Sequence, residues 1–228
     1  MMYKKIYLVI LIFVLCFILS GCSRSVLMYD FEDSTLEFEY GVANVAQDYE
    51  AKGYSIVVKQ AEIPNLNSNG LMMSAYNMGD NMFVYFYINA GKALKLDAAK
   101  TYDAQLTFDV ATMMPKASTN ITDKIPAQSV IIKAGMLSVK PSTTNTDNIL
   151  APNFKIGHYM TDEEYIKALG NIQKNNYKSS TSFEYKTFET KLTAQTDSEG
   201  NLYLLIGIDS YYIGPTWIFI DNIKFEIK

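Results

Sequence analysis

Regular alternation of apolar and polar side chains is the dominant pattern along most of this chain. Over residues 102–110 every second residue is apolar, and the residues between them are Asp, Gln and Thr. A period of two is typical of a β-strand with one buried and one solvated face. The same alternation recurs over residues 202–208, directly after a turn-forming run at residues 197–201. We predict further strands at residues 54–59, 70–75, 81–88, 129–134 and 183–192.

The C-terminal strand carries a carboxylate in the middle of an apolar face. Uninterrupted alternation places on one face Trp217, Phe219, Asp221, Ile223, Phe225 and Ile227. A buried carboxylate without a partner is very costly, so Asp221 requires a cation, a hydrogen-bond network or a proton. The alternative is a β-bulge between Ile220 and Ile223 that turns Asp221 to solvent or into a turn-like hydrogen bond.

One short helix is predicted at residues 162–169. Thr161 and Glu164 have the spacing of a capping box, in which each side chain satisfies an exposed amide of the other residue. Gly170 then supplies a helix stop.

Many strands at short intervals with one short helix predict an all-β fold. The expected architecture is an antiparallel two-sheet jelly-roll sandwich in a single domain over residues 28–228. Residues 115–128 and 141–152 are expected to be long loops at one end of the sandwich, where binding usually resides.

A hydrophobic run near the N-terminus has the features of a secretory signal peptide. Lys4 and Lys5 precede an unbroken apolar run over residues 6–19. A membrane-spanning helix needs about 20 apolar residues, so this run is short for a permanent span. It fits a signal peptide over residues 1–21. The alternative is an uncleaved anchor.

The segment that follows the apolar run resembles the lipobox of bacterial lipoproteins. It consists of Leu19, Ser20, Gly21 and Cys22. In that family the cysteine sulfur receives a diacylglycerol, the chain is cut before the cysteine, and the new amino group is often acylated with a chain such as palmitate. The resemblance implies a protein held at the cell membrane, on its extracytoplasmic side, with residues 22–27 as lipidated cysteine and short tether.

Composition narrows the chemistry that this chain can perform. Arg24 is the single arginine among 20 basic residues, and the net charge is -4. We therefore exclude nucleic acid as a partner. Removal of Lys4 and Lys5 leaves 18 basic against 24 acidic residues, a net charge of -6. Cys16 lies in the predicted signal peptide and Cys22 carries lipid, which excludes thiol catalysis and Cys-based zinc sites.

Two segments resemble the first and last strands of jelly-roll carbohydrate-binding modules, the galactose-binding-like sandwiches. They are residues 29–32 and 217–223. In that family an acid near the first strand and one in the last strand commonly share a structural calcium. The resemblance implies Glu32 and Asp221 as calcium ligands, and Asn222 stands where the family often has a second acid.

A second resemblance covers about residues 78–172. The segments that carry it are residues 79–83, 129–135, 153–157 and 168–172. They look like an uncharacterised family of bacterial secreted or lipid-anchored sandwich proteins. This resemblance implies a fold and a location, and it implies no reaction.

Aromatic side chains supply the candidate ligand contacts. One face of the strand at residues 81–88 carries Phe83, Tyr85 and Tyr87. On a concave sheet face such a row stacks on the C–H faces of sugar rings. The alternative is a central strand that is covered on both sides. Tyr211 and Tyr212, expected on a loop between the last two strands, are a second contact candidate, with loop packing as the alternative.

Catalytic signals are weak. His158 has Asp162 and Glu163 nearby in sequence, which is one way to build a general base, and a surface or capping role is the alternative. No G-x-S-x-G or HExxH motif is present. We expect a non-catalytic module that binds glycan or envelope polysaccharide. The alternatives are a structural or accessory envelope protein with a protein partner, and a glycoside-hydrolase-like enzyme with two acting carboxylates.

Overall fold

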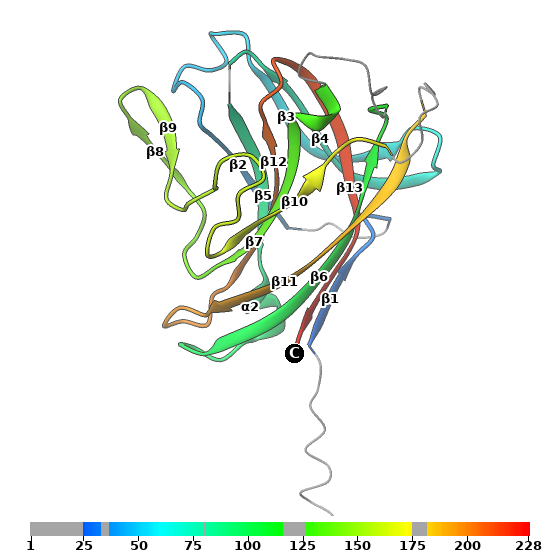
Figure 1. Ribbon diagram of the computed structural model, residues 1–228. Coiled ribbons are helices and arrows are strands. Elements are labelled where there is room, and N and C mark those ends of the chain that lie inside the picture. The colour runs from blue at the N-terminus through cyan, green and yellow to red at the C-terminus, as the bar shows by residue number, and fades with distance from the viewer. Residues whose placement is uncertain (1–24, 33–36, 80, 116–125, 175–181) are drawn as a thin grey trace, which may run out of the picture.

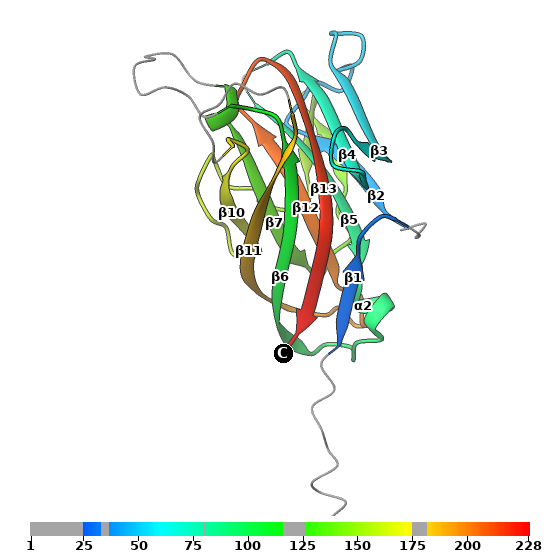
Figure 2. The same ribbon diagram turned by 90° about the vertical axis from the view of Figure 1, so that its right-hand side faces the viewer.

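Two antiparallel sheets pack face to face in the computed structural model, which describes residues 25–32, 37–79, 81–115, 126–174 and 182–228 (Figure 1). Sheet A has the order β11-β6-β13-β4-β3, with β1 paired to β13. Its strands are β1 (Val26–Tyr29), β3 (Ser55–Ile63), β4 (Ser68–Asn77), β6 (Thr101–Thr112), β11 (Glu184–Gln195) and β13 (Gly214–Ile227). Figure 2 shows this sheet from its outer side, with β6, β13 and β1 side by side.

Sheet B has the order β10-β7-β12-β5-β2. Its strands are β2 (Glu39–Ala43), β5 (Met82–Asn89), β7 (Val130–Leu137), β10 (Ile166–Asn171) and β12 (Tyr203–Ser210). The chain passes between the sheets at each step from β4 to β7 and again from β10 to β13. Such repeated crossing is the connectivity of a jelly roll, so the predicted all-β, antiparallel two-sheet sandwich is confirmed.

Three smaller elements complete the described part of the chain. They are helix α2 (Ala90–Leu94), the 3-10 turn η1 (Pro126–Gln128), and a hairpin of β8 (Thr143–Thr146) and β9 (Ile149–Pro152). The hairpin lies within the predicted long loop at residues 141–152, and Asp147 and Asn148 form its turn with positive φ. No helix among the described residues is long and apolar enough to cross a membrane.

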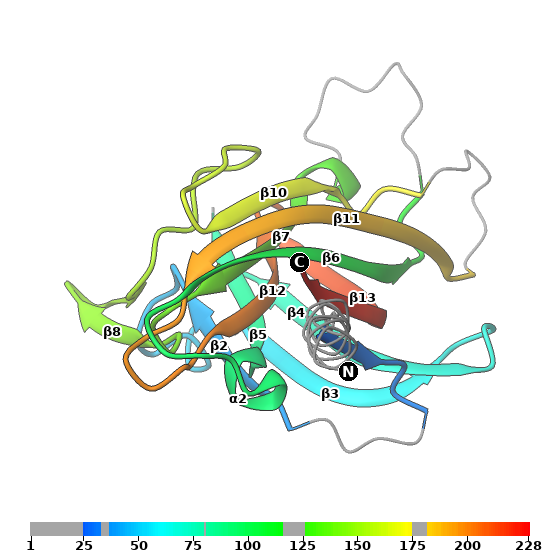
Figure 3. The ribbon, with the colours of Figure 1, turned by 90° about the horizontal axis from the view of Figure 1, so that it is seen from below.

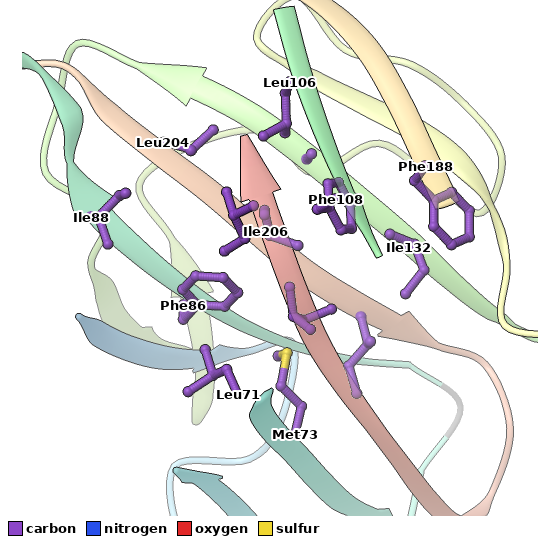
Figure 4. Close-up of a cluster of buried hydrophobic side chains, with 14 of the residues drawn as sticks. Leu71, Met73, Phe86, Ile88, Leu106, Phe108, Ile132, Phe188, Leu204 and Ile206 are labelled. Atoms are coloured by element: carbon purple, nitrogen blue, oxygen red, sulfur yellow. The ribbon is translucent and has the colours of Figure 1, made fainter. Parts of the chain in front are cut away.

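The core lies between the two sheets. Figure 4 shows its centre, where side chains of both sheets meet: Leu71, Met73, Phe86, Ile88, Leu106, Phe108, Ile132, Phe188, Leu204 and Ile206. All of them are buried. Alternate residues of each strand point into this layer, which is why the period of two in the sequence located β6 and β12 correctly, whereas β2, β8, β9 and β10 were not predicted.

The predicted helix at residues 162–169 is wrong. Residues from Ile166 onward form the edge strand β10, and Ile166 pairs with Gly135 of β7. The Asp162 carboxylate accepts the amide of Ala168 (2.9 Å) in place of a helix cap. Gly170, with a φ of 136°, marks a bulge in the strand and no helix stop. Burial of Ile166 on the sheet has overridden the local capping signal.

The prediction that the C-terminal strand has one uninterrupted apolar face is also wrong. The alternative bulge is present, but it does not turn Asp221 to solvent: this residue is 1% exposed and its Oδ1 accepts the amide of Asn222 (2.7 Å). The register of β13 against β6 shifts between Asp221 and Lys224, and Asn222 adopts a φ of 50°. Before the bulge Phe219 faces away from the core, whereas after it Ile223 points into the core. One extra residue reverses which side of the strand is buried.

The N-terminal end of the domain is fixed by strand pairing. β1 begins at Val26, which pairs with Glu226, so the fold starts two residues before the predicted boundary at residue 28. The amide of Ile227 donates to the carbonyl of Ser25 (2.9 Å). The start of β1, helix α2 and the end of β13 lie at one end of the sandwich (Figure 3). The predicted signal peptide and Cys22 lie outside the described residues.

Candidate functional site

The outer face of sheet B divides into two halves with different surroundings. Odd-numbered residues of β5 and β12 point to this face. The half that we call the covered half holds Phe83, Tyr85, Lys133 and Asp209, and it lies beneath residues 153–166, which we call the covering segment. The other half, called the open half, adjoins helix α2 and holds Tyr87, Asn89 and Tyr203.

Aromatic side chains of the covered half are buried. Phe154 of the covering segment packs edge-on against Phe83 (6.3 Å between ring centroids) and Tyr85 (5.4 Å). Phe83 is 0% and Tyr85 1% exposed. These two rings therefore offer no stacking surface to a sugar, and β5 is a strand covered on both sides, as the alternative interpretation had it.

Two glycines make room for the buried rings, because a Cβ atom at Gly41 would meet Tyr85 and one at Gly207 would lie 2.8 Å from the Phe83 ring. Gly41 of β2 and Gly207 of β12 are the register partners of Tyr85 on either side. A Cβ atom at Gly41 would lie 2.4 Å from the Tyr85 hydroxyl oxygen, so no other residue leaves space for it. Burial raises the pKa of Tyr85 to about 12, which keeps this phenol neutral.

An ion pair holds the covering segment on the sheet. Lys133 Nζ lies 3.1 Å from Asp209 Oδ2, and both side chains are buried. The same ammonium donates to the carbonyl oxygens of Ile156 (3.0 Å) and Gly157 (2.7 Å). Burial raises the pKa of Asp209, and the ammonium of Lys133 opposes that rise. The charge of Lys133 is thus shared between its own sheet and the segment above it.

The predicted loop tyrosines take part in packing. The Tyr211 hydroxyl donates to Asp209 Oδ2 (3.1 Å) and accepts the amide of Tyr159 (2.7 Å). Burial raises the pKa of Tyr211 to about 12. The Tyr212 ring packs on the core and leaves no room for a Cβ atom at Gly214. His158 is exposed with its ring edge-on to Tyr211 (5.1 Å), the surface position of the alternative interpretation.

A cleft of about 690 Å³ opens beside the open half. It lies between sheet B and the Tyr29 end of β1, and Lys92 and Ala93 of helix α2 line one side. Its lining consists of Tyr29, Glu37, Phe38, Glu39, Tyr87, Ile88, Asn89, Lys92, Ala93, Lys140 and Tyr203. Aromatic rings, carboxylates, an amide and ammonium groups therefore face one depression. Of the predicted contact residues, Tyr87 alone reaches it.

The polar groups of the cleft form a connected set. Lys140 Nζ lies 2.7 Å from Glu39 Oε1, and the Tyr87 hydroxyl donates to Glu39 Oε2 (2.9 Å). The hydrogen bond from Lys140 is the main cause that lowers the pKa of Glu39. Burial, together with the Glu39 carboxylate, raises the pKa of Tyr87. The Tyr203 ring stands edge-on to that of Tyr87 at 6.0 Å.

Asn89 holds helix α2 in place along one side of the cleft. Its Oδ1 accepts the amide of Lys92 (3.0 Å) as the helix N-cap, and its Nδ2 donates to Asn201 Oδ1 (2.8 Å).

Sequence reasoning missed Glu39, Lys140 and Tyr203 as site residues. Only for Tyr203 was there a signal, since it is an aromatic residue on the solvated face of an alternating strand.

The predicted calcium ligands do lie together, on the other sheet. The Ser68 hydroxyl oxygen is 2.7 Å from Glu32 Oε1 and 3.2 Å from Asp221 Oδ2. Asp221 also accepts the hydroxyl of Tyr185, and Glu32 accepts the amide of Asn69 (2.8 Å). Protein donors thus already occupy both carboxylates. Burial is the main cause that raises the pKa of Asp221, which is 1% exposed.

No cluster of three or more His, Cys, Asp or Glu side chains suited to a metal occurs in the part of the chain that the structure describes. Calcium would thus have to complete its shell with Ser68, carbonyls and water beside Glu32 and Asp221. These are oxygen ligands of the kind that calcium prefers. The hydroxyl groups of Ser68 and Tyr185 donate to these carboxylates. Calcium fits among the same oxygen atoms only when those hydroxyl protons point away from the ion, so calcium binding stays a prediction.

Comparisons with known proteins find similarity of fold alone. No family model and no curated protein matches the chain. Among solved structures, a family 11 carbohydrate-binding module of Clostridium thermocellum is 14% identical, with a TM-score of 0.43 over 88% of this chain and 93% of that chain. A xylan-binding domain of Paenibacillus barcinonensis is 7% identical (TM-score 0.38; 88% and 92%). A cyclase from Fischerella sp. TAU is 11% identical (TM-score 0.39; 90% and 98%).

Proposed function

We propose that this protein is a non-catalytic carbohydrate-binding module and that its ligand occupies the cleft beside helix α2. The observation that carries the proposal is the lining of the cleft. The half-buried rings of Tyr29, Phe38 and Tyr203 provide apolar faces for sugar C–H groups, and the Glu39 carboxylate provides acceptors for hydroxyl groups. A concave site with apolar walls and a few polar groups is the usual form of a small-ligand site.

The charge state of Glu39 suits an acceptor of hydroxyl groups and does not suit the acid of a glycoside hydrolase. Glycoside hydrolysis requires a carboxylic acid whose pKa is raised, so that it protonates the leaving oxygen. Glu39 has the opposite shift, because Lys140 and Tyr87 both donate to its carboxylate. Glu39 is therefore held as an ionised acceptor, which suits the recognition of hydroxyl groups.

Attachment to the membrane through Cys22 is part of the same proposal. β1 begins at Val26, so three residues lie between Cys22 and the fold, and the four steps from Cys22 to Val26 reach about 14 Å when extended. This attachment places the α2 end of the sandwich, and with it the cleft, toward the bilayer. The ligand class that this position favours is an envelope polysaccharide. Mass spectrometry of the native protein tests it, since an unmodified Cys22 or an intact Met1 contradicts the anchor.

Binding is tested by titrating the purified protein with saccharides selected on a glycan array. Tyr203→Ala removes the aromatic ring that β12 contributes to the cleft, and we expect it to weaken saccharide binding at least tenfold, about 1.4 kcal/mol. Tyr76→Ala is the matched control, because Tyr76 is 43% exposed on the outer face of sheet A. A blank array, or equal losses in the two variants, contradicts carbohydrate binding in the cleft.

A protein partner is the second candidate function, and a patch on sheet A favours it. Val57 (39% exposed), Tyr76 (43%) and Trp217 (37%) lie on the outer face of neighbouring strands β3, β4 and β13. Exposed aromatic and aliphatic side chains on one flat face are a feature of protein interfaces. Photo-crosslinking from position 76 in the intact cell envelope tests this candidate, and the absence of a specific adduct argues against it.

A further inference from the structure

A second, smaller cavity lies beside the cleft on the outer face of sheet B. It has a volume of about 340 Å³, and its apolar walls are Leu137, Val139, Phe154 and Tyr165. Val139 is 49% and Tyr165 42% exposed. The cavity therefore presents apolar surface to solvent, and its size is within the range of small-ligand sites.

One cross-strand pair separates this cavity from the cleft. Leu137 of β7 lines the cavity and is the direct register partner of Tyr203 of β12, which lines the cleft. Opposite side chains on neighbouring antiparallel strands lie about 5 Å apart. A substituent on a ligand in the cleft therefore enters the cavity by passing over this one pair of side chains.

The charges of the cavity favour an uncharged occupant. Its charged lining residues are Lys155, Glu163 and Glu164, so negative charge prevails. Such a rim repels carboxylate or phosphate groups, whereas the transfer of an alkyl chain from water into the cavity is favourable. The Glu164 carboxylate accepts the hydroxyl of Tyr165 and thereby raises the pKa of that phenol, which keeps Tyr165 neutral at the entrance.

We propose that the saccharide bound in the cleft carries an acyl or alkyl substituent of a few carbons, and that the apolar cavity accommodates this substituent. The inference rests on the proposed carbohydrate binding and specifies its ligand class, an acylated glycan in place of a bare polysaccharide. Each buried methylene contributes about 0.8 kcal/mol, which corresponds to about fourfold in affinity.

The test uses paired glycosides and the full-length protein in lipid nanodiscs, with empty nanodiscs as the blank. The probes are the methyl, propyl and pentyl glycosides of glucose, galactose, mannose, rhamnose and N-acetylglucosamine, measured by isothermal titration calorimetry. We expect at least one sugar to bind, with affinity rising about two- to fourfold per added methylene. Because short alkyl chains leave the sugar unchanged, the slope reports on the cavity and the methyl glycoside reports on the cleft.

Two variants test whether the dependence of affinity on chain length arises in the cavity. Val139→Asp places a charge in the cavity wall, and we expect it to remove the chain-length dependence while the methyl glycoside keeps its affinity within twofold. Val57→Asp is the control, since Val57 is a similarly exposed valine (39%) on the opposite sheet. Tyr203→Ala is expected to weaken the methyl and the pentyl glycoside alike.

The possible results separate this inference from the proposed function. Binding of methyl glycosides without a chain-length effect overturns the inference and leaves carbohydrate binding intact. A chain-length effect that is the same for every sugar and unaffected by Tyr203→Ala overturns both, because the cavity then acts alone. No binding of any glycoside also overturns both. A slope that Val139→Asp removes and Val57→Asp preserves supports the inference.

Discussion

The covered and open halves of sheet B differ although the same strands build them. Each half contains a lysine–carboxylate pair, Lys133–Asp209 at 3.1 Å and Lys140–Glu39 at 2.7 Å. In the covered half the two side chains are 0% and 1% exposed, whereas in the open half they are 54% and 61% exposed. The same chemistry thus holds a segment in one half and lines an open cleft in the other. Which role a pair takes depends on whether another segment lies over it.

The largest expected effect is a loss of folding stability when the lysine of the buried Lys133–Asp209 pair is replaced. Lys133→Met leaves Asp209 buried without its partner, and loss of one partner of a buried pair typically costs about 3–5 kcal/mol. Equilibrium urea denaturation measures the change in the free energy of unfolding. The control is Lys140→Met in the exposed pair, for which about 0–1 kcal/mol is expected. Equal losses at the two positions would mean that burial does not distinguish them.

Opening of the covered half is expected to have the next largest effect. Phe154→Ala removes the ring that packs on Phe83 and Tyr85, and because Phe154 is only half-buried we expect a loss of about 2–3 kcal/mol, below the range for a fully buried Phe. The uncovered rings should also increase binding of a hydrophobic dye such as ANS. Phe38→Ala, a half-buried ring at the cleft, is the matched control. Unchanged dye binding in Phe154→Ala would show that the segment is held by the Lys133 contacts alone.

A pH-dependent effect of smaller size is expected on sheet A. Burial raises the pKa of Asp221 above its ordinary value of 3.8, so the folded state holds this proton more tightly than the unfolded state. The stabilisation that Asp221 provides is therefore present at low pH and lost as pH rises from about 3.8 through the folded pKa. Asp221→Asn lacks this loss, so in calcium-free buffer its advantage over the native chain should grow across that interval.

Melting curves of the native chain and of Asp221→Asn at several pH values measure this difference. A constant difference would contradict the raised pKa. The same curves with millimolar calcium test the predicted ion, because a cation on Glu32 and Asp221 stabilises the native chain and not the variant. If chelator and calcium give identical curves for the native chain, the calcium site is ruled out.

Strand positions were predictable because alternation is a local property. Each strand needs only that one face be apolar, and residues 102–110 or 202–208 display this without reference to the rest of the chain. Of the core residues in Figure 4, Leu106, Phe108, Leu204 and Ile206 follow from the same pattern. The proximity of Glu32 and Asp221 was also predicted, through a resemblance between the two terminal segments and those of known sandwiches.

Other features depended on contacts between segments that are distant in sequence. The helix signal at Thr161 and Glu164 lost to strand pairing with β7, and the face of Phe219 was set by a single positive φ at Asn222. The residues of the cleft come from β2, β5, α2, β12 and the segment after β7. No spacing rule relates Glu39 to Lys140 along the chain.

Apolar periodicity specifies which side of a strand avoids water, since a side chain's direction follows from the backbone alone. It does not specify what excludes the water. Tyr85 and Tyr87 are two residues apart on the same face, yet one lies under Phe154 and the other lines a cleft. That difference arose only when residues 153–166 packed on one half of sheet B, because burial depends on every segment that comes close in space.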